Sequence, residues 1–161
     1  MRTSVVFLIG LLSGTALTTV LAQGDKPNGV NYVNHVAIAV DNFDEAFTFY
    51  TQKMGFKEAF TIKDAAGKPT LAYVQASRNT FVELQQANAT RKAGLNHYGL
   101  HVENLKATVA TLKQHGVTVD DVRVRPDDSS VANATDPGGI RIEMFEFGPG
   151  SPQGKAVAAW K

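Results

Sequence analysis

Two histidines and two glutamates occupy matching positions in the two halves of the sequence. His35 and His97 are 62 residues apart, and Glu83 and Glu143 are 60 residues apart. Each lies in a segment where apolar and polar residues alternate, as they do in a β-strand. Imidazole nitrogens and carboxylate oxygens are common ligands of Zn, Ni, Mn and Fe(II). The repeated pattern favours a divalent metal site with room for a substrate over the alternative, a solvated sheet face that happens to carry polar residues.

The alternation predicts that all four residues lie on one face of a sheet, because successive side chains of a strand point to opposite sides. In the first strand, His35 shares its face with Ala37 and Ala39. In the matching strand of the second half, His97 shares its face with Gly99. Very small residues beside polar ones leave open space, which favours a pocket over a filled core.

The elements that carry these residues are predicted to form one βαβββ unit that occurs twice. The first copy has a helix at 43–54 and strands at 34–40, 56–62, 70–75 and 80–85. The second copy has a helix at 105–114 and strands at 96–102, 117–124, 131–134 and 140–147. An Asn-His pair opens the first strand of each copy. We therefore expect an α+β fold in which two modules, at about 30–88 and 95–148, form an open, curled mixed sheet around a cleft.

Two further residues are candidates for substrate contact. His101 follows His97 by two positions and so lies on the same face of the strand. It could act as a base, contact the substrate or lie at the rim of the pocket. Arg141 is also predicted on this face and could bind an anion, although a salt bridge explains it equally well.

The composition excludes several classes of protein. Of 161 residues, 16 are Lys or Arg and 15 are Asp or Glu, so no basic excess points to nucleic acid. The sequence has no cysteine, which excludes disulfides, a thiolate nucleophile and a zinc site built on cysteine. We expect a small-molecule substrate as the partner.

The two ends of the chain are predicted to lie outside the repeated domain, which spans 23–148. Residues 1–22 read as a signal peptide: Arg2 precedes an apolar stretch at 5–12, and Ala22 ends a short segment suited to cleavage. This predicts a secreted or periplasmic protein that makes no membrane contact after cleavage, the alternative being an uncleaved N-terminal anchor. Residues 149–161 read as a C-terminal tail.

These segments resemble the vicinal oxygen chelate superfamily, which includes glyoxalase I, extradiol dioxygenases, methylmalonyl-CoA epimerase and the fosfomycin and bleomycin resistance proteins. The resemblance covers about residues 32–147. It rests on NHVAIAV at 34–40, FTFYTQKMGF at 47–56, FVEL at 81–84, NHYGLHV at 96–102 and DPGGIRIEMFEF at 136–147. It implies a divalent metal held in the cleft by the positions that correspond here to His35, Glu83, His97 and Glu143.

The full set of two histidines and two glutamates is similar to that of bacterial glyoxalase I. The resemblance implies lyase or isomerase chemistry, in which Glu143 or Glu83 carries a proton between adjacent carbons. The arginine that binds glutathione in that enzyme is replaced here by Ala39. The alternatives are an Fe(II) extradiol-type dioxygenase and a non-enzymatic drug-binding protein of the bleomycin-resistance type. The resemblance also allows a homodimer, because such clefts form within one chain or across two.

Overall fold

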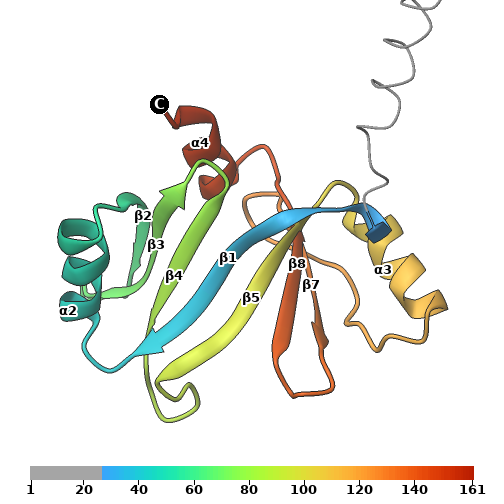
Figure 1. Ribbon diagram of the computed structural model, residues 1–161, viewed down its shortest axis with the longest axis horizontal. Coiled ribbons are helices and arrows are strands. Elements are labelled where there is room, and N and C mark those ends of the chain that lie inside the picture. The colour runs from blue at the N-terminus through green and yellow to red at the C-terminus, as the bar shows by residue number, and fades with distance from the viewer. Residues whose placement is uncertain (1–26) are drawn as a thin grey trace, which may run out of the picture.

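The structure is a computed structural model, and it describes residues 27–161. Residues 1–26, with the predicted signal peptide at 1–22, lie outside the described part. Across residues 27–161, no helix combines the length and the apolar character needed to cross a membrane. This part of the chain forms one eight-stranded sheet with helices α2, α3 and α4 beside it (Figure 1).

The sheet is open and mixed, with the strand order β2-β3-β4-β1-β5-β8-β7-β6. The first module contributes β1 (Val30–Val40), β2 (Lys57–Lys63), β3 (Pro69–Ser77) and β4 (Thr80–Gln86). The second module contributes β5 (Gly94–Val102), β6 (Arg123–Val124), β7 (Ser130–Thr135) and β8 (Arg141–Glu146). The four strands that carry the predicted metal ligands, β4, β1, β5 and β8, are therefore neighbours at the centre of the sheet.

The pairing of the strands repeats between the modules. β1 runs parallel to β4, and β5 runs parallel to β8. The two halves meet where β1 pairs with β5 in antiparallel orientation. This arrangement confirms the predicted α+β fold of two βαβββ units in one open mixed sheet.

A helix follows the first strand of each module. α2 (Phe43–Thr48) continues into one π-helical turn, η2 (Phe49–Lys53), and α3 spans Leu105–Gln114. The side chains of Asn42 and Asn104 accept hydrogen bonds from backbone N–H groups in the first turn of α2 and α3, respectively, which explains where both helices begin.

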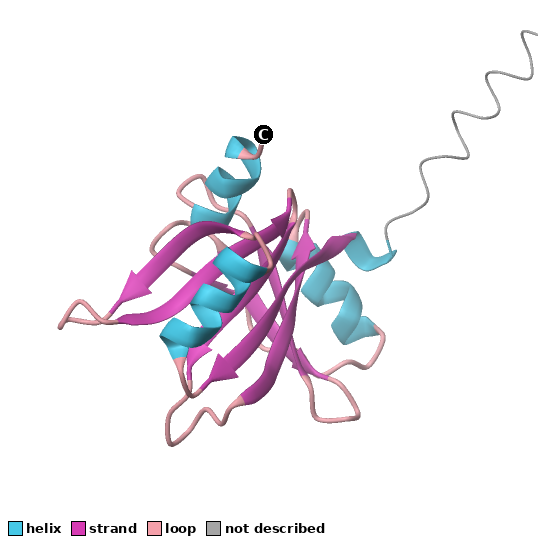
Figure 2. Cartoon of the chain, turned by 60° about the vertical axis from the view of Figure 1, so that its left-hand side comes forward, coloured by secondary structure: helices cyan, strands magenta, loops and turns pink. Residues whose placement is uncertain are grey.

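α2 and α3 cover one face of the sheet and leave the other face to the histidines and glutamates. Phe43 of α2 packs with Leu84 of β4, and Figure 2 shows this helix lying across the strands of its module. Val109 of α3 packs with Val102 and Met144 of the second module. The apolar residues of the alternating strands therefore form two small cores, one under each helix, as the pattern predicts.

Two segments differ from the sequence-based expectation. The strand predicted at 117–124 is reduced to β6 at Arg123–Val124, with a single bridge from Val119 to Ala134. The segment at 149–161 contains a helix, α4 (Pro152–Ala159), which the sequence analysis did not predict. α4 is held against the first module, where Gln75 donates to the Ala156 carbonyl and the Lys57 ammonium lies 4.5 Å from the centre of the Trp160 ring.

Candidate metal centre

The four predicted ligands converge on the face of the sheet away from α2 and α3. Nε2 of His35 lies 3.0 Å from Nε2 of His97 and 3.4 Å from Oε2 of Glu83. Oε2 of Glu143 lies 3.6 Å from the His35 nitrogen and 3.9 Å from the His97 nitrogen. Nε2 of His97 is also 3.4 Å from Oε2 of Glu83. All four side chains are buried, with 7% or less of each exposed.

The spacing and chemistry of these atoms fit a divalent cation. Metal–ligand bonds of about 2.0–2.2 Å place neighbouring ligand atoms roughly 3–3.5 Å apart. His35, Glu83 and His97 form the most compact group, with their donor atoms within 4.8 Å of one another. Glu143 approaches both histidines at slightly longer distances. The lone pairs of the imidazole nitrogens and the charged carboxylate oxygens repel one another when they are buried together. A positive ion between them would offset that repulsion.

The register of the strands explains why two very small residues lie beside the ligands. Gly99 pairs with His35 on one side and with Glu143 on the other. Ala37 pairs with His97 on one side and with Glu83 on the other. Each small residue therefore separates a histidine of one module from a glutamate of the other, and leaves the space into which both side chains turn.

A β-bulge lies directly before each histidine ligand. The β1–β5 pairing skips Asn34 on β1 and Asn96 on β5, so each asparagine is the extra residue of a bulge. A bulge allows an asparagine to turn towards the same side as the histidine that follows it. Asn34 Oδ1 lies 3.1 Å from Nδ1 of His35, and Asn96 Oδ1 lies 2.8 Å from Nδ1 of His97.

Asn34 favours one tautomer of His35. When the Nδ1–H group donates to the asparagine, the lone pair of Nε2 points at the centre of the site. Arg141 Nη2 donates to Asn96 Oδ1 at 2.8 Å and lies 2.5 Å from Nδ1 of His97. A guanidinium has donors only, so Nδ1 of His97 lies between a donor on Arg141 and an acceptor on Asn96, and these two contacts favour opposite tautomers.

The two glutamates differ in their hydrogen bonds. The Tyr73 hydroxyl donates to Oε2 of Glu83 at 2.7 Å, and Gln85 Nε2 donates to Oε1 at 2.6 Å. Glu143 accepts from Arg125 Nη2 at Oε1 only, at 2.9 Å, so its Oε2 faces the histidines without a further donor among the described residues. Glu83 is thus held at both oxygens, and Glu143 at one.

Burial and neighbouring charges set the protonation of the cluster. Burial lowers the pKa of His35 to about 4, together with the positive charges of His97, Arg125 and Arg141 and against the attraction of Glu83. Burial alone would raise the pKa of Glu83. The two histidines and Gln85 stabilise its charged form more strongly and hold its pKa at about 2. At neutral pH the cluster therefore offers a neutral imidazole of His35 and an ionised carboxylate of Glu83.

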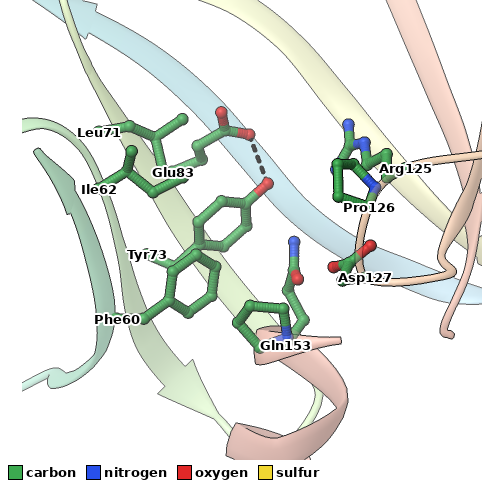
Figure 3. Close-up of a pocket in the computed structure, with 10 residues that line it drawn as sticks. Phe60, Ile62, Leu71, Tyr73, Glu83, Arg125, Pro126, Asp127 and Gln153 are labelled. Atoms are coloured by element: carbon green, nitrogen blue, oxygen red, sulfur yellow. Dashed lines mark hydrogen bonds between the residues drawn. The ribbon is translucent and has the colours of Figure 1, made fainter. Parts of the chain in front are cut away.

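A cavity of about 370 Å³ opens beside Glu83 (Figure 3). Phe60 and Leu71 form an apolar wall with Tyr73, whose ring stacks on that of Phe60 at 4.7 Å. The opposite wall comes from the second module and the C-terminal segment, through Arg125, Pro126, Asp127, Pro152 and Gln153. The cavity is thus open to a small molecule that could reach the cluster.

The two predicted substrate contacts lie away from this cavity. His101 stacks on Tyr32 at 4.9 Å, packs against Phe147, and lies 2.9 Å from Nδ2 of Asn31. Arg141 lies behind His97, where it contacts Asn96 and Asn133. Neither side chain lines the cavity beside Glu83.

Three residues at the site were missed by the sequence analysis. Arg125 belongs to the loop after β6, and no periodicity predicts where a loop side chain points. Tyr73 does lie on an alternating strand, and its position opposite Glu83 in the β3–β4 pairing could have indicated the contact. Gln153 lies in α4, which was not predicted.

Comparison with known proteins assigns this geometry to a family. A profile of the "Glyoxalase/Bleomycin resistance protein/Dioxygenase superfamily" matches residues 32–144. The chain belongs to this superfamily. The match covers both modules and all four ligand positions, and it ends before α4.

The relatives that match this superfamily member have low sequence identity. A probable lactoylglutathione lyase of Vibrio cholerae is 27% identical over 121 residues, which are 70% of this chain and 88% of that protein. The protein YaeR of Escherichia coli is 24% identical over 126 residues, 73% of this chain and 98% of that protein. The crystal structure of methylmalonyl-CoA epimerase from Mycobacterium tuberculosis has a TM-score of 0.67 and 21% identity, covering 86% of this chain and 99% of that chain. The epimerase confirms the fold.

Proposed function

We propose that this protein is an exported, metal-dependent enzyme with glyoxalase-I-like lyase or isomerase chemistry. The observation that carries the proposal is the convergence of two Nε2 atoms, 3.0 Å apart, with two carboxylate oxygens that each lie 3.4–3.9 Å from both nitrogens, on a buried face beside a cavity. The weak similarity to the probable lactoylglutathione lyase of Vibrio cholerae supports the class of reaction. Export is supported by the pattern of Arg2 and the apolar stretch at 5–12.

His35, Glu83, His97 and Glu143 would hold the ion, which could be Ni, Zn, Mn or Fe. When bound, a divalent ion acts as a Lewis acid that stabilises negative charge on two neighbouring substrate oxygens. Asn34 would keep the imidazole of His35 in the tautomer that this requires, and Asn96 would orient the ring of His97. Glu83, held at both oxygens by Tyr73 and Gln85, is suited to remain a ligand.

Glu143 is the carboxylate suited to carry a proton between adjacent substrate carbons. Its Oε1 accepts from Arg125, while Oε2 has no other donor among the described residues. A carboxylate anchored at one oxygen keeps the other free to take up and return a proton, which contributes about 10²–10⁴-fold in rate. Arg125 would act as a positioning residue, because it orients Glu143 from the wall of the cavity.

Metal analysis of the untagged protein, followed by activity assays, tests this proposal. We expect about one divalent ion per chain and conversion of the adducts that methylglyoxal forms with small thiols, seen as a rise in thioester absorbance. Glu143→Gln should retain the ion and lower kcat at least 100-fold, whereas Glu45→Gln on the exposed side of α2 should change neither.

Three results would contradict the proposal. Iron with oxygen uptake on catechols would favour the dioxygenase, and failure to take up any ion would favour a binding protein. Full activity of Glu143→Gln would exclude Glu143 as the proton carrier. Export is tested separately by fractionating bacteria that express the whole chain: a mature protein that begins at Gln23 is expected, and a cytosolic chain that begins at Met1 would contradict it.

A further inference from the structure

The outer end of the cavity is built partly by a segment of the chain that the superfamily profile does not cover. The profile ends at residue 144, and α4 begins at Pro152. Pro152 and Gln153 nevertheless line the same cavity as Glu83 (Figure 3). This C-terminal segment therefore shares the outer end of the cavity with Asp127, which lies within the profile.

Gln153 presents a buried amide group to the cavity. Only 5% of the residue is exposed, and its side chain points into the cavity in Figure 3. The Ser151 hydroxyl accepts from the backbone N–H of Gly154 at 3.1 Å, and its own hydrogen points to Oε1 of Gln153 at 3.4 Å. The carboxamide oxygen is thereby engaged, and Nε2 has no acceptor among the described residues. Nε2 is accessible from the cavity, so a ligand atom in the cavity can accept from it.

Asp127 presents an acceptor to the same cavity. Its Oδ1 accepts from the backbone N–H of Ser129 at 3.1 Å, whereas Oδ2 has no donor among the described residues. The connection that precedes α4 holds Asp127 in place, because the N–H of Gly150 donates to the Asp127 carbonyl at 3.2 Å. The outer end of the cavity therefore offers one donor, on Gln153, and one acceptor, on Asp127.

The charges around this end favour a neutral group. Asp127 repels an anion, and the nearest cation in the cavity wall, Arg125, is already paired with Glu143 at 2.9 Å. A hydroxyl group can accept from Gln153 and donate to Asp127. Between this end and Glu83, the wall of Phe60 and Leu71 suits a short apolar linker.

We propose that Gln153 and Asp127 form a subsite for a neutral, hydroxyl-bearing tail of the substrate. This inference rests on the proposed function, because it assigns the opposite end of the substrate to the metal centre. The substrate class is a small molecule with two vicinal oxygens at one end, a short apolar linker, and an uncharged hydroxyl at the other. A large anionic thiol such as glutathione does not meet this description.

Binding of hydroxamates to the Zn²⁺-loaded protein tests the subsite without relying on turnover. A hydroxamate head carries two vicinal oxygens, and the tail can be varied at nearly constant length. The probes are acetohydroxamate, pentanohydroxamate, 4-hydroxybutanohydroxamate and the monohydroxamate of succinate, which carry no tail, a methyl end, a hydroxyl end and a carboxylate end. By calorimetry, we expect the hydroxyl-ended probe to bind about 3- to 10-fold more tightly than the methyl-ended one.

Two variants locate the effect. Gln153→Met preserves the shape of the side chain and should abolish the preference for the hydroxyl end, while the affinity for acetohydroxamate stays within about twofold of the original. Asp127→Asn removes the negative charge of the side chain and should reduce the difference in affinity between the hydroxyl-ended and carboxylate-ended probes. Unaltered binding of acetohydroxamate shows in each case that the fold and the metal centre are intact.

The failures of the two proposals are distinguishable. If acetohydroxamate binds but all tails bind equally, or if Gln153→Met keeps the preference, the subsite is wrong and the metal-dependent function stands. Tighter binding of the carboxylate-ended probe would also overturn the neutral subsite. If no hydroxamate binds the Zn²⁺-loaded protein, both the subsite and the proposed function are overturned.

Discussion

The ring of His35 lies directly over Gly99. A Cβ atom on Gly99 would fall 2.0 Å from Cε1 of His35 and 2.5 Å from its Nε2. Atoms cannot approach so closely, and His35 is fully buried, so its ring has no free space into which it could move. The absence of a side chain at position 99 is therefore a condition for the position of His35.

Gly99→Ala should displace the His35 ring and weaken divalent metal binding at least 10-fold. The free energy of unfolding should fall by about 1–3 kcal/mol, as for other overpacked cores. Competition with a chromophoric chelator measures the affinity, and denaturant unfolding measures the stability. Gly138→Ala is the matched control, since its Cβ would meet only the Asp136 side chain, at 3.3 Å. Wild-type metal affinity in Gly99→Ala would show that His35 is not a ligand.

Asn96→Leu should weaken metal binding about 10- to 100-fold, because loss of an acceptor behind a histidine ligand frees its ring. Asn96→Asp keeps an oxygen for Nδ1 of His97 and for Arg141, so its affinity should stay close to that of the original protein. Titration with Zn²⁺ against a competing chelator compares the two variants. Equal affinities would mean that the bulged asparagine does not position His97.

The metal-free protein should lose stability as the pH falls from about 6.5 towards 4. Burial lowers the pKa of His35 in the folded state to about 4, whereas in the unfolded chain it is about 6.5. Between these values the unfolded chain binds more protons, so the free energy of unfolding decreases as the pH decreases. Urea unfolding with a chelator present at pH 7 and pH 4.5 measures the slope, and His35→Gln should reduce it. An unchanged slope in the variant would contradict the lowered pKa.

Gly148→Ala should detach the loop that carries Arg125 and Asp127 from the connection that precedes α4. A Cβ on Gly148 would lie 2.2 Å from the backbone carbon of Asp128, and backbone atoms cannot rotate away. We expect a loss of about 1–3 kcal/mol in the free energy of unfolding. Gly150→Ala should cost less, since its nearest contact, the Asp127 carbonyl oxygen, lies at 3.0 Å. Thermal unfolding of the two variants checks this order. A larger loss of stability in Gly150→Ala than in Gly148→Ala would contradict it.

The convergence of the candidate metal ligands was largely predictable, because strand alternation and internal repetition both indicate the same four positions. Alternation assigned all four residues to one face, and their repetition in both modules favoured a metal site over a solvated sheet face. The Asn-His pairs were visible in the sequence, but their role depends on two bulges that shift the register of β1 and β5. Such shifts arise from pairing between distant strands, so local patterns do not reveal them.

The cavity walls were less predictable because they come from loops and from the C-terminal segment. Arg125 reaches Glu143 from a loop whose course is set by contacts with Gly148 and Gly150. α4 contains a glycine and begins after a Gly/Pro-rich stretch, so its helical propensity is low, and its docking on β2 stabilises it. The strand predicted at 117–124 is incomplete because it pairs with β7 only at its end and at the single bridge of Val119.

Each module supplies one histidine and one glutamate to the centre, so neither half of the chain carries the complete set. His35 and Glu143 are 108 residues apart in the sequence, and an ion held by both would join the two modules much as a covalent cross-link does. The ion would then strengthen the antiparallel contact between β1 and β5, because it would bind side chains of both modules. Removal of the ion would then speed the separation of the two halves, so the ion would determine how long the folded protein survives.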